Sequence, residues 1–87
     1  MRHGIAYTTN EAEGAWPNGS FVRKANSQPG DGTADGVVGQ VVGSLDARSV
    51  GPWAAFAYFV RWPHFPHPVF CVDTNRDGTP RLELVVQ

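Results

Sequence analysis

The amino-acid sequence predicts a small all-β protein, an antiparallel barrel of five short strands with a loose N-terminal tail. The length of 87 residues is enough for one small domain with its own core. Ten glycines and seven prolines divide the chain into short segments, and no segment carries the 3.6-residue apolar stripe of an amphipathic helix. Closing the sheet into a barrel would remove the exposed strand edges that promote aggregation.

The N-terminal half predicts a tail followed by two strands. Residues 1–18 have no sustained apolar period and are expected to form a flexible tail, so that the domain covers residues 19–87. A strand is predicted over residues 20–25, after an Asn-Gly turn signal. A loop rich in Gly, Pro and Asp covers residues 26–36, and a second strand follows over residues 37–45, whose glycines indicate sharp bending or close backbone approach.

The C-terminal half predicts three further strands. The longest covers residues 53–62, which are rich in the aromatic and β-branched side chains that suit strands. Three prolines within residues 63–68 exclude a helix or a central strand there. A fourth strand is predicted over residues 69–72, and a turn-rich connection over residues 73–80 leads to an alternating last strand over residues 81–86.

Composition excludes several classes of protein. No apolar run approaches the roughly 20 residues of a membrane-spanning helix, so no membrane partner is expected. The formal net charge of −1 argues against a nucleic-acid partner, although residues 39–43 contain a glycine-valine word that resembles KOW-type RNA-binding barrels, which keeps that role as an alternative. The single cysteine, Cys71, excludes an internal disulfide and favours a reducing compartment, so we expect a cytoplasmic protein.

Several predicted strands are apolar on both faces. In the third strand Tyr58, Val60 and Trp62 point to one side, whereas the large apolar Phe59 points to the other. A domain of this size has one core, so the second apolar face predicts self-association into a dimer or tetramer, or a bound partner. The alternative is that the tail and loops cover this face.

Short words in the sequence carry a resemblance to a known family. These words are Val22-Arg23-Lys24, Gly39-Gln40-Val41-Val42-Gly43, Tyr58-Phe59-Val60 and Leu82-Glu83. In this order the chain resembles an SH3-like barrel and, within that class, the plasmid-type (type II) dihydrofolate reductases carried on integron gene cassettes. It is also similar to uncharacterised small proteins of such mobile gene cassettes. The resemblance implies a homotetramer around a central pore that holds folate and NADPH.

Two features depart from the reductase pattern. Where that family places a Val-Gln-Ile-Tyr word, this chain reads Val69-Phe70-Cys71-Val72. The one lysine, Lys24, lies inside the first strand rather than shortly before the Gly-Gln word. We therefore predict a non-enzymatic binding module without a cofactor, and keep the NADPH-dependent pore enzyme as the alternative hypothesis.

One turn contains a pattern of calcium ligands. Asp73, Asn75 and Asp77 occupy positions one, three and five of a loop of the kind that begins many calcium sites. The ninth and twelfth positions hold Arg81 and Leu84 instead of acidic ligands. The sequence therefore leaves two interpretations open, a calcium-stabilised barrel and a strand connection whose polar side chains cap their own backbone.

Aromatic residues are the predicted binding residues. Aromatic anchors dominate interface energetics, and SH3-like barrels often bind through aromatic side chains in their loops. We expect these residues to contact a protein, a small molecule or a second copy of the chain. The predicted ligand or interface residues are Trp53, Phe59, Trp62, Phe65 and Phe70.

Overall fold

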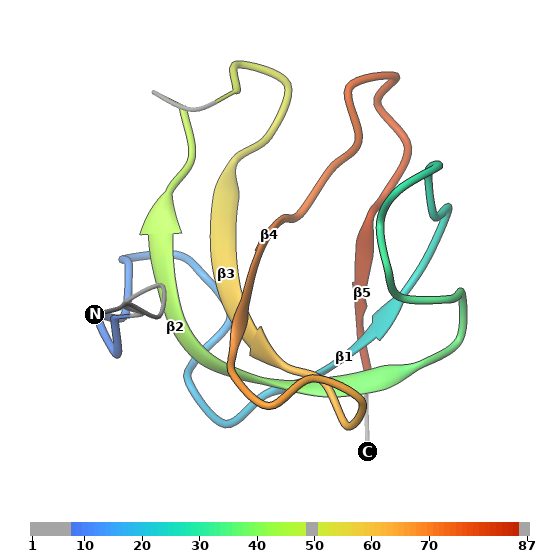
Figure 1. Ribbon diagram of the computed structural model, residues 1–87. Coiled ribbons are helices and arrows are strands. Elements are labelled where there is room, and N and C mark those ends of the chain that lie inside the picture. The colour runs from blue at the N-terminus through green and yellow to red at the C-terminus, as the bar shows by residue number, and fades with distance from the viewer. Residues whose placement is uncertain (1–7, 49–50, 86–87) are drawn as a thin grey trace, which may run out of the picture.

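The computed structural model describes residues 8–48 and 51–85 of the chain, and Figure 1 shows one strongly curved sheet. The strands are β1 (Phe21–Lys24), β2 (Val38–Asp46), β3 (Phe56–Arg61), β4 (Val69–Val72) and β5 (Leu82–Leu84). All neighbours are antiparallel, and the order across the sheet is β4-β3-β2-β1-β5. The predicted all-β fold of five antiparallel strands is thus confirmed. No helix in the described part of the chain has the length and apolar character needed to cross a membrane.

The predicted closure into a barrel is wrong. β4 and β5 are the two outer strands of the sheet, and no ladder joins them within residues 8–48 and 51–85. A single isolated bridge between Thr74 and Pro80 pairs the two segments next to the turn that connects them. Beyond this bridge the two strands separate, and one side of the barrel stays open.

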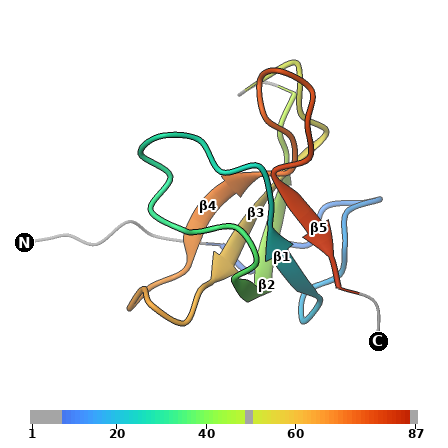
Figure 2. The ribbon, with the colours of Figure 1, turned by 90° about the vertical axis from the view of Figure 1, so that its right-hand side faces the viewer.

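The loop of residues 25–37 makes contacts with the segments on both sides of this opening. At one end Asp31 accepts a hydrogen bond from Arg81, at the start of β5. At the other end Thr33 Oγ1 lies 3.2 Å from His64 Nε2, in the turn between β3 and β4. Figure 2 shows the loop arching out from the end of β1 and returning to β2, nearer the viewer than β4.

The glycines of β2 permit the close approaches that the sequence predicted. A Cβ atom at Gly39 would lie 2.6 Å from the Trp62 ring, and one at Gly43 would overlap the backbone of Thr8. The register of β2 against β3 also shifts between Val41 and Gly43, which marks a bulge. This strand can therefore bend sharply while its neighbours pack directly on its backbone.

The core lies inside the curve of the sheet. Its buried members are Val22, Val41, Tyr58, Val60, Trp62, Cys71 and Leu82. A smaller cluster of Ala47, Ala54 and Ala57, with Trp53 and Val72 against it, lies near the end of the sheet where β2 stops and β3 begins. Burial of these apolar surfaces is the main force that holds so short a chain together.

The N-terminal segment packs on the sheet wherever the structure describes it. Within residues 8–18, Ser44 N donates to Asn10 O over 2.7 Å. The Trp16 ring stacks on Tyr58 with 4.9 Å between ring centroids, and Trp16 N donates to the Tyr58 hydroxyl over 3.1 Å. These contacts differ from the free tail expected from the sequence; residues 1–7 of that tail lie outside the described part.

The chain itself covers much of the predicted second apolar face. Phe59 is only 7% exposed, because the ring of Phe70 meets it edge-on at 5.6 Å and the backbone of Thr8 lies on Gly43, its partner in β2. Phe70 itself is 41% exposed. The apolar surface left for self-association is therefore smaller than the alternation of the strands indicated.

Candidate functional site

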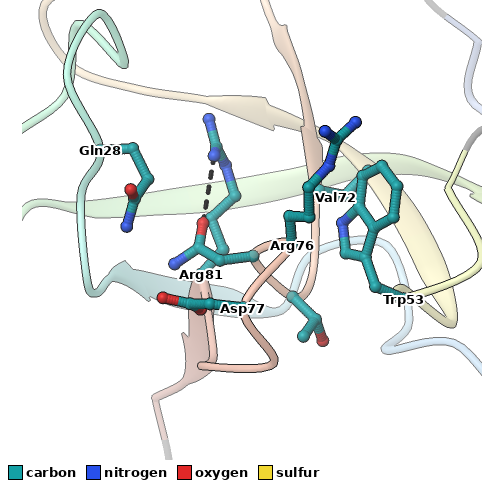
Figure 3. Close-up of a pocket in the computed structure, with 8 residues that line it drawn as sticks. Gln28, Trp53, Val72, Arg76, Asp77 and Arg81 are labelled. Atoms are coloured by element: carbon teal, nitrogen blue, oxygen red, sulfur yellow. Dashed lines mark hydrogen bonds between the residues drawn. The ribbon is translucent and has the colours of Figure 1, made fainter.

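Three connections meet at one end of the sheet and enclose a pocket (Figure 3). They are the loop of residues 25–37, the segment of residues 51–55 before β3, and the turn of residues 73–81 between β4 and β5. We call this site the Trp53 pocket; its lining residues are Gln28, Trp53, Val72, Thr74, Asn75, Arg76, Asp77 and Arg81.

The turn between β4 and β5 is held by its own side chains. Gly78 adopts a φ of 90°, which favours glycine. The Asp77 carboxylate accepts hydrogen bonds from Thr79 N at 3.0 Å and Thr79 Oγ1 at 2.6 Å. The hydrogen bonds from Thr79 lower the pKa of Asp77 below its usual value. Asn75 N also donates to Thr79 O over 2.8 Å, which completes a tight hairpin.

The three residues of the calcium pattern face different partners. The Asp73 carboxylate accepts from the backbone of Ala55 at 3.2 Å and of Phe56 at 3.3 Å, and Asp77 is occupied by the turn itself. Among the described residues no group of three or more His, Cys, Asp or Glu side chains converges on a common point. Of the three residues, Asp77 caps the backbone of its own turn, as the second interpretation expects, whereas Asp73 and Asn75 bond to other segments; the calcium interpretation stays a prediction.

Asn75 connects this turn to the long loop. Its side chain is buried, and its Nδ2 donates to Asn26 O over 2.9 Å and to Thr79 Oγ1 over 3.1 Å. Its Oδ1 accepts from Arg81 Nη1 over 3.2 Å. All three contacts are internal, so Asn75 is a positioning residue that fixes the wall of the pocket and orients Arg81.

A buried cluster of three charged residues lies behind this wall. Asp31 accepts from Lys24 Nζ at 3.1 Å through one oxygen and from Arg81 Nη2 at 2.5 Å through the other. The side chains of Lys24, Asp31 and Arg81 are 1%, 9% and 22% exposed. Burial alone would raise the pKa of Asp31, but hydrogen bonds from Gln28 N and Lys24 and the positive charges of Arg81 and Lys24 lower it below its usual value. We call these residues the Lys24–Asp31–Arg81 triad.

Trp53 forms the apolar wall of the pocket together with a cation. Sequence reasoning placed Trp53 at the start of the third strand, but it lies in the turn before β3, where Ala54 N donates to Gly51 O over 3.0 Å. The Arg76 guanidinium lies over the indole, 4.8 Å from the ring centroid, which is a cation–π contact. Figure 3 shows Trp53 and Arg76 at one end of the pocket, Gln28 at the other and Arg81 between them.

Two hydrogen-bond donors at this site have no acceptor in the described part of the chain. Three buried side-chain N–H atoms are unpaired among those residues: Trp53 Nε1, Trp62 Nε1 and Arg81 Nε. Two of these belong to residues that line the Trp53 pocket. Buried donors are nearly always paired in folded proteins, so an unpaired donor in each of two lining residues is an unusual feature of this site.

The structure does not bring the five predicted binding residues together. Trp62 is a core residue that is 1% exposed, and Phe59 is buried against Phe70 on the outer face. Phe65 is half-buried, packs against the core and touches Gly32. Of the five, Trp53 alone lines the pocket described above, and Phe65 and Phe70 line a separate apolar pocket with the prolines of the β3–β4 turn.

Sequence reasoning missed the polar residues of the site. Arg76 appeared as part of a turn, Arg81 at the start of the last predicted strand and at the ninth position of the calcium pattern, and Gln28 as part of a loop. Arg81 is 50 residues from Asp31, so no local pattern joins them. The sequence signal that could have indicated the buried charges was the single lysine, Lys24, which lies on the same face of β1 as the core residue Val22.

Comparisons of the chain with protein-family models, with curated protein sequences and with solved structures found no match. The part of the resemblance that the structure bears out is a small sheet of five antiparallel strands. The reductase relationship and the integron-cassette relationship stay predictions.

Proposed function

We propose that this chain is a non-enzymatic binding module, built on an SH3-like sheet, whose ligand occupies the Trp53 pocket. The observation that carries the proposal is the pair of unpaired donors, Trp53 Nε1 and Arg81 Nε, in residues that line one pocket. The sheet order, with β5 beside β1, supports the SH3-like part of the proposal. The ligand is a small molecule, or a side chain of a protein partner, with acceptor atoms and an apolar portion.

Binding is favoured over catalysis because the pocket lacks a reactive pair. The side chains around it are amides, guanidiniums, a hydroxyl and the Asp77 carboxylate, which the turn already occupies. Cys71 lies in the core, and burial raises the pKa of its thiol, which leaves little thiolate at neutral pH. Titration with NADPH to millimolar concentration tests the reductase alternative; binding at that level would favour it.

The experiment that tests the proposal is a fragment screen by two-dimensional NMR on the 15N-labelled full chain. Each tryptophan gives one indole N–H signal, so Trp16, Trp53 and Trp62 report on three separate places. We expect fragments with acceptor atoms to shift the Trp53 indole and the Arg81 Nε–H signals, and to leave Trp16 unchanged.

Two controls make the screen specific to this pocket. Arg76 is an exposed residue whose guanidinium lies over the Trp53 indole. Arg76→Ala therefore uncovers the indole and should alter the affinity of every fragment that binds in the pocket. Phe70→Ser changes the separate apolar pocket and should alter none. Hits that shift only signals near Phe70, or a screen without any shift of Trp53, would contradict the proposal.

A further inference from the structure

We infer that the ligand of the Trp53 pocket carries an oxyanion, a carboxylate or phosphate group attached to a flat apolar body, which balances the charge of the Lys24–Asp31–Arg81 triad. This inference rests on the proposed function, since it names the chemistry of the ligand at the same site. It follows from three features: the triad contains more cations than carboxylates, a second guanidinium (Arg76) lines the pocket, and an apolar wall lies beside the two guanidiniums.

The triad contains two cations and one carboxylate. Lys24 has used its three donors, on Ala25 O at 3.3 Å, Ser27 Oγ at 3.0 Å and Asp31 Oδ2 at 3.1 Å. Arg81 donates one hydrogen bond from Nη1 and one from Nη2, whereas its Nε–H has no acceptor among the described residues. The triad therefore has one more cation than carboxylate, and the member with donors still unpaired, Arg81, is also the member that lines the pocket.

An incompletely paired charge at low exposure is unfavourable, and an anion beside it relieves that cost. The Arg81 side chain is 22% exposed, the most of the three triad members, although its Nε atom is itself buried. A planar guanidinium presents its donors in a fixed fork, which matches the two oxygens of a carboxylate or phosphate. The triad thus favours an oxyanion over a neutral acceptor.

A second guanidinium stands at the same pocket. No ion pair within residues 8–48 and 51–85 includes Arg76, and its planar group rests on the Trp53 ring. The one acidic side chain in the lining, Asp77, already accepts two hydrogen bonds from Thr79. Two arginines consequently line a pocket whose one carboxylate, Asp77, forms an ion pair with neither of them in the described part of the chain.

The apolar wall of the pocket determines which apolar group the ligand carries beside its oxyanion. Trp53 and Val72 stand on the Arg76 side of the pocket, and because the Arg76 guanidinium lies over the indole ring, a flat apolar body is expected to contact Val72 and the edge of the indole. An aromatic body on this wall places its acidic group next to Arg76 and within reach of Arg81. The expected ligand is therefore a small aromatic acid or aryl phosphate, bound with its charged end toward the long loop.

The test compares probes of the same shape and different charge. Benzoate, phenyl phosphate and neutral benzamide are titrated into the 15N-labelled full chain at constant ionic strength, with the Trp53 indole signal as the readout. We expect at least one of the two anions to bind about tenfold more tightly than benzamide, the effect of one charge-assisted hydrogen bond. The two anionic probes separate a carboxylate preference from a phosphate preference.

Two variants then locate the anion. Arg76→Gln should weaken binding of the preferred anion about five- to tenfold. Arg61→Gln removes the same charge from an exposed position on β3, which lines a different hollow, and should change the affinity less than twofold if the anion binds at the Trp53 pocket. Equal losses in both variants would show non-specific attraction and would overturn the inference.

Failure of this inference differs from failure of the proposed function. If benzamide binds as well as benzoate and phenyl phosphate, and all three shift Trp53, the pocket is a binding site but the oxyanion is wrong. If neither anion shifts Trp53 at tens of millimolar, the inference is also overturned, while neutral hits from the fragment screen would leave the binding function standing.

Discussion

Replacing the shared carboxylate of the triad is the most direct test of how the open side of the sheet is held. Asp31→Asn keeps the size of the side chain and leaves Lys24 and Arg81 with a neutral partner. Removing one partner of a buried ion pair costs about 3–5 kcal/mol. We expect the free energy of unfolding to fall by about 3 kcal/mol, at the low end of this range, because Arg81 is 22% exposed and Lys24 keeps its bonds to Ala25 O and Ser27 Oγ.

This loss is a large share of the total stability. A domain of 87 residues has a free energy of unfolding of about 5–10 kcal/mol. Urea denaturation followed by tryptophan fluorescence is the assay, and with a slope of about 1 kcal/mol per molar the midpoint should fall by about 3 M. An unchanged slope would show that the unfolded state is not affected.

The matched control is Asp35→Asn in the same loop. Asp35 accepts a hydrogen bond from Ser27 N at 2.8 Å, but it is an exposed residue and belongs to no ion pair among the described residues. Its loss removes the same charge from the same segment without uncovering a buried cation, so the midpoint should move much less. If Asp31→Asn lowers the midpoint no more than Asp35→Asn does, the triad does not anchor the loop and the reasoning is refuted.

Four further predictions follow from the structure. The lowered pKa of Asp31 implies stability that is present above the unfolded-state pKa of about 4 and is lost as the pH falls through the folded-state value; urea midpoints between pH 2 and 7 should fall less steeply in Asp31→Asn. Burial raises the pKa of the Cys71 thiol, so a disulfide reagent at pH 8 should label it only at the rate of opening, and immediate labelling of the native chain would contradict its core position. Light scattering should give a dimer or tetramer that Phe70→Ser converts to monomer; a wild-type monomer at high concentration would end the self-association hypothesis. Because the Asp73 and Asp77 carboxylates already accept hydrogen bonds from the chain, about a tenfold molar excess of calcium should leave the melting temperature unchanged, and so should a chelator.

The positions of the strands follow from the sequence because each depends on local pattern. Aromatic and β-branched residues between glycines and prolines place β4 at Val69–Val72, where it was predicted, and place the other four strands within three residues of their ends. Local pattern could also place the turn after β4, since Gly78 and the Asp and Asn residues around it carry the conformation. Such features need no knowledge of distant parts of the chain.

The open side of the barrel and the site could not be derived in this way. Both depend on pairs that lie far apart in sequence, such as Arg81 with Asp31, 50 residues apart, and Trp16 with Tyr58, 42 residues apart. The hydrophobic alternation predicts that another segment buries Phe59, but it does not predict which segment. The N-terminal segment does so because Gly43 has no side chain to keep the Thr8 backbone away.

The same contacts that replace strand pairing on the open side also build the proposed ligand site, and this links binding to folding. Asp31 anchors the loop that contributes Gln28 to the pocket, and Arg81 joins that loop to the start of β5. A ligand that pairs with Arg81 binds the folded chain and has no counterpart in the unfolded chain, where the triad is dispersed. At a ligand concentration of about 100 times Kd this linkage adds about 2.7 kcal/mol to the free energy of unfolding. The gain is close to the loss expected for Asp31→Asn, so a saturating oxyanion should raise the wild-type melting temperature substantially, and should raise that of Arg76→Gln less because one of the two guanidiniums is gone.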